Sequence, residues 1–343
     1  MNTENINVQI PPSAAENIEK LLGDFDFDRV IASVTAGKFS LDSGGILNNI
    51  ISLFLGELKG AFLLIGSVIA VILIGSFIKN LDNSFGKNDF SRAGEIAIFL
   101  YIATISATAF GLVTEYVLGA LDDITIFVHA IIPSVTMLAL SGGEVASATM
   151  SHPVMYFVCS AFGLLIKNVI TPLVLLRAVC TLLCAVTGNE SLGEFTALFT
   201  KLHKTLLALS MSLFAGIMGI SSFAAASFDS LAARGVKFAI NASVPVVGGS
   251  ISEAMSSVAG SAMLLKNAVG LGGVIVIFSM FAIPLLKIWA LSLAFRLTAA
   301  FTAPISDKKV SETLRKLGEC IDMFFSSVAS TGTIMIILMA SIL

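Results

Sequence analysis

Serine and glycine residues in one small-residue segment are the first candidates for chemistry. Ser250, Ser252 and Ser256 follow Gly248-Gly249, but no His or Lys stands at a spacing that would activate a serine nucleophile. The glycine pair also lacks the Lys-Ser/Thr that completes a phosphate-binding loop. The chain is therefore predicted to be neither a serine protease nor a nucleotide-binding protein, and not an enzyme.

Cysteine and histidine residues do not indicate a metal or cofactor site. Cys180 and Cys184 would share one helix face, but no third and fourth ligands accompany them. His129, His152 and His203 are scattered along the chain. We expect no cofactor and no metal. The net charge of −3 argues against nucleic acid as a partner.

Acidic residues at membrane depth are stronger functional candidates, because burying a charge is costly. Glu144 follows Gly142-Gly143, and Glu253 follows a second glycine pair. This comparable placement makes both acids candidates for lining a pathway, with a structural ion pair or an exposed turn as the alternatives. The candidate pathway and packing residues are Pro133, Gly142, Gly143, Glu144, Pro245, Gly248, Gly249 and Glu253.

These candidates stand in two ambiguous segments, residues 124–150 and 230–266, which are interrupted by glycine and proline. Each segment could form a re-entrant hairpin or two short spans. Irregular backbone persists at membrane depth only where protein buries it or water lines it, and broken helices often line transport pathways. The alternative is a pair of small-residue helices packed tightly against their neighbours.

The composition places the chain in a membrane. Of the 343 residues, 56% are hydrophobic and 13% are charged, about half of the roughly 25% charge of a soluble domain. Several apolar runs reach the roughly 20 residues that cross a bilayer. The predicted fold class is an all-α polytopic membrane protein.

Six apolar runs predict the spanning helices. They lie at about residues 60–78, 96–118, 153–187, 205–226, 268–302 and 321–342. Pro172 and Pro284 stand near the middle of the two longer runs and predict kinked or broken helices there. Together with the ambiguous segments, this gives six spans plus two broken or re-entrant hairpins, or eight spans.

The N-terminal region, residues 1–58, is the sizeable polar part of the chain. A capping box at Ser13–Glu16 predicts a short helix. Apolar residues in 47–58 recur at helical spacing, which predicts an amphipathic interfacial helix or an extension of the first span. Residues 59–343 form the predicted transmembrane domain. Residues 1–30 show no signal peptide, so the first span directs insertion or a leader has been removed.

Lysine and arginine residues predict the orientation. They gather in three loops near residues 79–92, 201–204 and 308–316, whereas a short loop predicted at Gly119–Asp123 has two acids and no cation. Placing the basic loops in the cytoplasm puts both termini and the N-terminal region outside. A candidate cytoplasmic contact comprises Lys308, Lys309, Arg315 and Lys316. The alternative is that these residues serve only as a positive-inside anchor.

Two parts of the chain show a weak internal similarity. The residues around Pro133 resemble those around Pro245. Pro172 and Pro284 are separated by the same number of residues along the chain as Pro133 and Pro245. This predicts a parallel pseudo-repeat, an arrangement that is common in transport folds. The predicted units are residues 96–187 and 205–302.

One block of the chain resembles a known family. KFAINASVPVVGGSI at Lys237–Ile251 is followed by SEAM at Ser252–Met255, by LLKNAVG at Leu264–Gly270 and by PLLK at Pro284–Lys287. This sequence resembles the stage III sporulation protein AE family, and the likeness extends from about residue 59 to the C-terminus.

The resemblance implies a setting, partners and a function. The setting is the mother-cell membrane that engulfs the forespore of an endospore-forming bacterium. The partners are the other stage III sporulation A-operon proteins, including a secretion-type ATPase and ring-forming subunits, and indirectly stage II sporulation protein Q. Together they resemble a secretion-like channel that supports forespore development. The family transfers no catalytic residues, and the alternative function is an autonomous permease-like transporter of a small solute.

Overall fold

The computed structural model describes residues 11–23, 27–36, 43–85, 89–243 and 248–341, and the regular elements of these residues are helices. They are α1 (Pro12–Leu22), α2 (Phe27–Thr35), α3 (Ser43–Phe85), α4 (Asp89–Ser141), the π-helical η2 (Ser147–Ser151), α5 (His152–Leu165), the π-helical η3 (Ile166–Ile170), α6 (Thr171–Thr187), α7 (Glu190–Ser243), α8 (Gly248–Thr302) and α9 (Lys308–Ala340).

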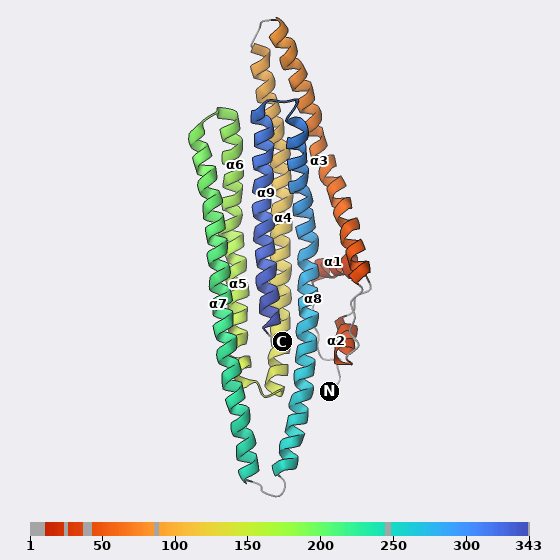
Figure 1. Ribbon diagram of the computed structural model, residues 1–343, viewed down its shortest axis with the longest axis vertical. Helices are drawn as coiled ribbons and strands as arrows, with labels where there is room; N and C mark the ends of the chain where they lie inside the picture. The colour runs from red at the N-terminus through yellow and green to blue at the C-terminus, as the bar shows by residue number, and fades with distance from the viewer. Residues whose placement is uncertain (1–10, 24–26, 37–42, 86–88, 244–247, 342–343) are drawn as a thin grey trace.

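Long helices alternate in direction and form one elongated bundle (Figure 1). Among the described residues, six helical stretches are long and apolar enough to cross a membrane. They are Gly44–Phe77, Gly94–Ser141, Ser147–Thr187, Ser191–Ala232, Ala259–Thr302 and Lys308–Ala340. The all-α class and the six spans are confirmed.

The described residues of the two ambiguous segments belong mostly to long helices. Residues 124–141 continue α4 without a break, and Pro133 lies inside this helix with its ring exposed. Residues 230–243 likewise continue α7, and residues 248–266 belong to α8. The described residues therefore contain two helical hairpins in place of separate re-entrant elements or additional spans. A hydrophobic pattern could not distinguish these arrangements, because small apolar residues suit both.

The apolar helices are longer than one bilayer requires. The six stretches contain 33 to 48 residues, or roughly 50–70 Å of helix, against a hydrocarbon core of about 30 Å. The predicted loop at Gly119–Asp123 is wrong, because these residues lie within α4. A cation on a neighbouring helix compensates one of the two acids, since Lys167 Nζ lies 3.5 Å from the Asp122 carboxylate.

Helix α8 is central to the packing and contacts α3, α4, α7 and α9. Its contact with α9 is close because glycines on α9 face it. A Cβ at Gly332 would lie 2.9 Å from ring atoms of Phe281, and one at Gly318 would lie 3.4 Å from the Ser292 carbonyl oxygen. The Ser292 hydroxyl also donates to the Gly318 carbonyl at 3.2 Å. Small residues thus allow the two helices to approach closely, as is common in membranes.

The two central prolines have different surroundings. Pro172 is at the start of α6, directly after the π-helical residues Ile166–Ile170. A π-helical turn is one of the known irregularities that interrupt a long helix. Pro284 lies inside α8, which the structure describes as continuous from Gly248 to Thr302. The predicted irregularity is confirmed at Pro172, whereas α8 is not interrupted at Pro284.

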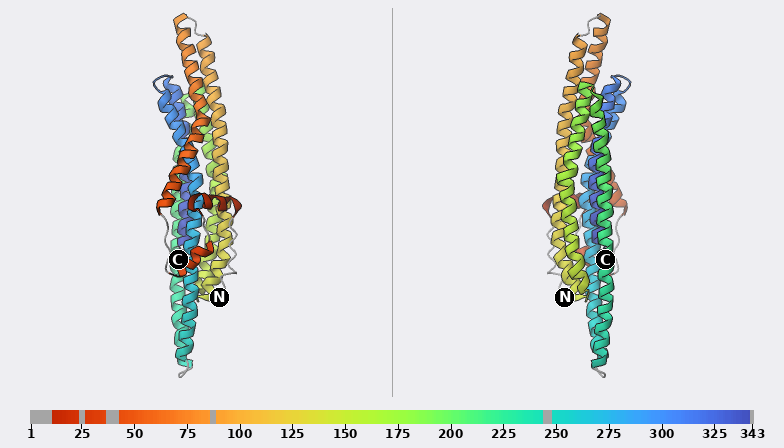
Figure 2. Two further views of the ribbon diagram at one scale, coloured as in Figure 1. Left: turned by 90° about the vertical axis from the view of Figure 1, so that its right-hand side faces the viewer. Right: turned by 90° about the vertical axis from the view of Figure 1, so that its left-hand side faces the viewer.

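The N-terminal helices α1 and α2 pack against α8, and α1 lies across the bundle (Figures 1 and 2). The predicted short helix is confirmed, but it begins at Pro12, so Ser13 lies inside it and Pro11 takes the N-cap position. No side chain caps this end. The side-chain amide of Asn49 donates to the Leu21 carbonyl at 3.1 Å and joins α1 to α3.

The turns after α6 and α8 lie at the same end of the bundle as the end of α3 and the start of α4 (Figure 1). Lys309 of α9 lies 3.8 Å from Glu95 of α4 at this end. The described parts of the basic regions that the sequence assigned to one side therefore lie at one end of the bundle. Which side of the membrane they face stays a prediction, as do the domain boundary after residue 58 and the pseudo-repeat, although α3 continues through residues 58 and 59.

Candidate functional site

The glycine pair after α4 forms the turn that positions the site. The Glu144 amide donates to the Ala139 carbonyl at 2.9 Å, and the Gly143 amide donates to the Leu140 carbonyl at 3.1 Å. These two bonds define a Schellman motif, which requires a left-handed residue just past the helix end. Gly143 supplies it with φ of +85°. The motif fixes the position of Glu144 at the entrance to the next helix.

Glu144 forms an ion pair with a cation from the second ambiguous segment. Lys266 Nζ of α8 donates to the Glu144 carboxylate at 2.7 Å. Their side chains are 10% and 16% exposed, so the pair is largely removed from water. Each charge needs the other there, because an unpaired buried charge is strongly unfavourable. The two segments that the sequence singled out thus meet through a buried ion pair.

Asp229 of α7 holds the start of the next helix. Its carboxylate accepts from the backbone amides of Ala146 and Ser147, at 2.6 and 2.9 Å, and from the Ser147 hydroxyl at 2.7 Å. A carboxylate at this position satisfies amides that have no partner within the helix and favours the helix dipole. Asp229 therefore links α7 to the hairpin between α4 and α5.

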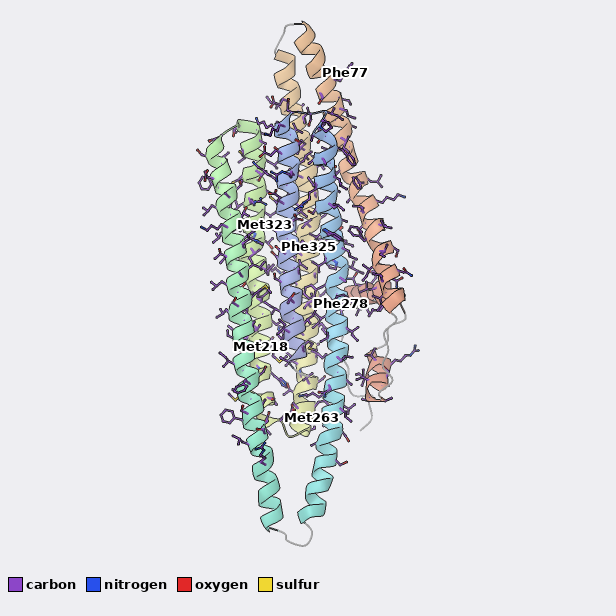
Figure 3. All side chains as sticks on the ribbon, viewed as in Figure 1. Phe77, Met218, Met263, Phe278, Met323 and Phe325 are labelled. Atoms are coloured by element: carbon purple, nitrogen blue, oxygen red, sulfur yellow. The ribbon has the colours of Figure 1, made fainter. Side chains whose placement is uncertain are left out.

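The three charged residues surround a cavity of about 450 Å³. Gly142 and Gly143 also line it, and so does His152, whose Nδ1 lies 2.8 Å from the Thr136 hydroxyl. The buried Ser222 hydroxyl, another lining group, has no hydrogen-bond partner among the described residues. Met263, labelled in Figure 3, contributes to the wall from α8.

This arrangement places charged and hydrogen-bonding groups between apolar helices, where they can bind a polar solute or water. One ammonium, two carboxylates and several hydroxyls line the cavity. Over the described residues, no three His, Cys, Asp or Glu side chains are grouped as a metal site. The site therefore offers binding and packing chemistry.

The structure places the predicted site residues unequally. Gly142, Gly143 and Glu144 line the cavity, whereas Pro133 is on an exposed position of α4. Pro245 lies outside the described residues. Gly248, Gly249 and Glu253 belong to the first turns of α8, in the hairpin that extends beyond the cavity (Figure 1). The pathway role of all eight residues stays a prediction.

Sequence reasoning did not assign Lys266 and Asp229 to the site, although each carries a signal. Asp229 is the lone charged residue in 205–233, and Lys266 is the lone charged residue in 254–286. An isolated charge in an apolar helix needs a partner. Which charges pair could not be deduced, because the pairing depends on how three helices align.

The candidate cytoplasmic contact residues lie in the first turns of α9. Lys316 pairs with Glu312 at 3.1 Å, and Arg315 pairs with Glu319 at 2.6 Å, each one helical turn away. Lys308 is exposed and lines a neighbouring cavity of about 670 Å³. Much of this basic charge is thus compensated within α9.

Comparison with known proteins confirms the family resemblance that the residues between Lys237 and Lys287 indicated. The family model described as stage III sporulation protein AE matches residues 25–343. The chain belongs to this family. It is similar to the stage III sporulation protein AE of Bacillus subtilis (strain 168), with 26% identity over 266 aligned residues. The aligned region covers 78% of this chain and 67% of that protein. No solved structure matches the chain.

Proposed function

We propose that this protein is the membrane subunit of a sporulation-specific channel between mother cell and forespore. It lies in the mother-cell membrane, with both termini outside, and supports forespore development. It acts together with the other stage III sporulation A-operon proteins, including an ATPase and ring-forming subunits, and indirectly with stage II sporulation protein Q. It is not a stand-alone enzyme.

The observation that carries this proposal is the family match, which covers nearly the whole chain from residue 25 to residue 343. The six apolar helices support the location in a membrane. In this proposal, α1 and α2 face the intermembrane space and offer a docking surface there. Their outward residues include Glu16, Glu19, Lys20 and Arg29, which are exposed and polar.

The cavity around Glu144 supports a role in a pathway or in its closure. A polar cavity inside an apolar bundle is costly unless its groups are paired, and intramembrane charges often mark transport routes. The Glu144–Lys266 pair joins α8 to the turn after α4, and Asp229 joins that turn to α7. A change in these contacts would alter how the two hairpins sit against each other.

Two measurements test the proposal. Deleting the gene in its own host should abolish heat-resistant spores, and restoring the full chain should recover them. Purified protein in proteoliposomes should move no small solute at a useful rate, because a subunit needs its partners. Rapid solute flux by the protein alone would instead establish an autonomous permease.

The basic residues of α9 can be tested separately. Reversing the charge of all four should reduce recovery of the ATPase in a pull-down if they form a contact. Correct insertion with normal sporulation and unchanged pull-down would show that they serve only as a positive-inside anchor. The four residues are Lys308, Lys309, Arg315 and Lys316.

A further inference from the structure

A cavity of about 670 Å³ lies at the end of the bundle where α8 ends and α9 begins (Figure 1). Its two sides differ in chemistry. The α8 side is lined by Arg296 and three alanines, whereas the α9 side is lined by charged side chains and one serine. The cavity shares no residue with the one around Glu144.

Three cationic side chains reach this cavity from the surface. The side chains of Arg296 and Arg315 are 49% and 57% exposed, and Lys308 is also exposed. Each arginine uses one terminal nitrogen for an ion pair, Arg296 with Asp322 and Arg315 with Glu319. The other terminal nitrogen and Nε of both arginines have no partner among the described residues, and no described carboxylate pairs with Lys308. Solvent-accessible donors on three cations therefore remain for a ligand.

Positive charge exceeds negative charge around the cavity. The two carboxylates that line it are already engaged, Glu312 with Lys316 at 3.1 Å and Glu319 with Arg315 at 2.6 Å. Glu319 also accepts from the buried Arg177 at 3.2 Å. Together with Arg296, Lys308 and Asp322, these residues comprise five cations and three carboxylates. The excess of two positive charges attracts an anion.

The surroundings favour an amphipathic anion. Ala299, Ala300 and Ala303 place methyl groups beside the guanidinium groups in the cavity wall. Phe301 and Ile305 are 57% and 48% exposed, so apolar surface continues to this end of the bundle. Basic pockets between the ends of membrane helices bind the headgroups of anionic lipids. An alanine wall opposite a cationic wall fits a molecule that is part apolar and part anionic.

We propose that this cavity binds the phosphodiester headgroup of an anionic phospholipid, as in phosphatidylglycerol. The phosphate oxygens accept from the unused nitrogens of Arg296 and Arg315 and from the Lys308 ammonium, through charge-assisted bonds. The apolar part of the lipid lies against the alanine wall. A zwitterionic lipid such as phosphatidylcholine carries its own cation, which the excess positive charge repels, so the site discriminates between the two headgroups. This assignment does not rest on the proposed channel role.

The test is native mass spectrometry of the full-length chain in detergent, titrated with phosphatidylglycerol or with phosphatidylcholine of the same acyl chains. We expect the first phosphatidylglycerol to bind saturably and about tenfold more tightly than the first phosphatidylcholine. Lys308→Gln and Arg315→Gln should each weaken this binding about three- to tenfold, since each removes a charge-assisted bond at a partly exposed position. Lys201→Gln is the matched control, because it removes an exposed cation of α7 that does not line the cavity. It should leave the affinity unchanged.

Equal affinity for the two lipids would overturn the proposal. An equal loss in Lys201→Gln and Lys308→Gln would also overturn it, because the lipid would then respond to the net charge of the protein. Binding of glycerol 3-phosphate alone with the affinity of the lipid would show that the ligand is a soluble phosphate ester, and would contradict the lipid assignment. Lys308 is exposed and Glu319 keeps Arg177 as a partner when Arg315 is replaced, so both variants should keep the helical circular dichroism of the wild type.

Discussion

Replacing Lys266 by methionine tests whether the buried ion pair holds the two hairpins together. The change removes the ammonium that lies 2.7 Å from the Glu144 carboxylate and leaves that acid without its partner. Methionine is close to lysine in length and preserves the apolar stem. We expect a large loss of stability, together with fewer heat-resistant spores, because the unpaired carboxylate stays in a place with little water.

The magnitude follows from how deeply the pair is buried. Removing one member of a fully buried pair costs about 3–5 kcal/mol. Here the lysine and glutamate side chains keep 10% and 16% of their exposure, so we expect about 2–4 kcal/mol. Adding Glu144→Gln to Lys266→Met should restore part of the loss, since the double variant no longer buries an unpaired charge.

The assay is unfolding in mixed detergent–dodecyl sulfate micelles, followed by the circular dichroism of the helices. The matched control is Lys20→Met, which breaks an ion pair of the same residue types in α1. There Lys20 and Glu16 are 2.5 Å apart, but the side chains are 47% and 65% exposed, and the unfolding midpoint should not move. Equal midpoints for wild type and Lys266→Met would refute the reasoning.

Three further changes have specific expected outcomes. Gly143→Ala should lower the free energy of unfolding by roughly 1–2 kcal/mol, because alanine is strained in a left-handed conformation. Gly142→Ala is the control: its Cβ would lie 3.4 Å from the nearest atom, so the free energy of unfolding should be nearly unchanged. Gly248→Leu should reduce spore counts and assembly by overpacking a small-residue contact, and normal counts would argue against such a contact. Single cysteines introduced in place of Lys87, Lys201 and Lys309 should resist an impermeant thiol reagent applied from outside. Strong labelling at all three positions would contradict the predicted orientation.

Much of the fold was predictable because it follows from composition and hydrophobic run length. Leu, Ile, Val and Ala runs of spanning length must form helices, since lipid offers no other partner for the backbone. The family was also recognisable from the residues between Lys237 and Lys287. These properties are local in sequence and do not depend on how helices pair.

The arrangement of the hairpins was not predictable. Gly119–Asp123 reads as an acidic loop, yet it lies within α4, where Lys167 pairs with Asp122. Pro133 reads as a break, yet a proline on an exposed helix position is tolerated where the chain continues. Neither outcome can be read from a single sequence, because a short acidic run or a lone proline occurs both in loops and inside membrane helices.

Only one part of the candidate site was predictable, because the rest depends on how distant helices pack. Glu144 and the glycines before it were singled out, because an acid beside a glycine turn is rare in an apolar segment. Its partners Lys266 and Asp229 come from helices about 120 and 80 residues further along the chain. Only the alignment of α7 and α8 against that turn brings them together.

The most direct test of the channel-subunit role is isolation of the tagged full-length chain from sporulating cells of its own host under mild detergent. We predict that the secretion-type ATPase and the ring-forming proteins of the stage III sporulation A operon are recovered with it. Their recovery should fall when Lys266→Met is introduced, and it should persist with the control Lys20→Met. Isolation of the chain without any of these proteins, from cells that still form heat-resistant spores, would contradict the account.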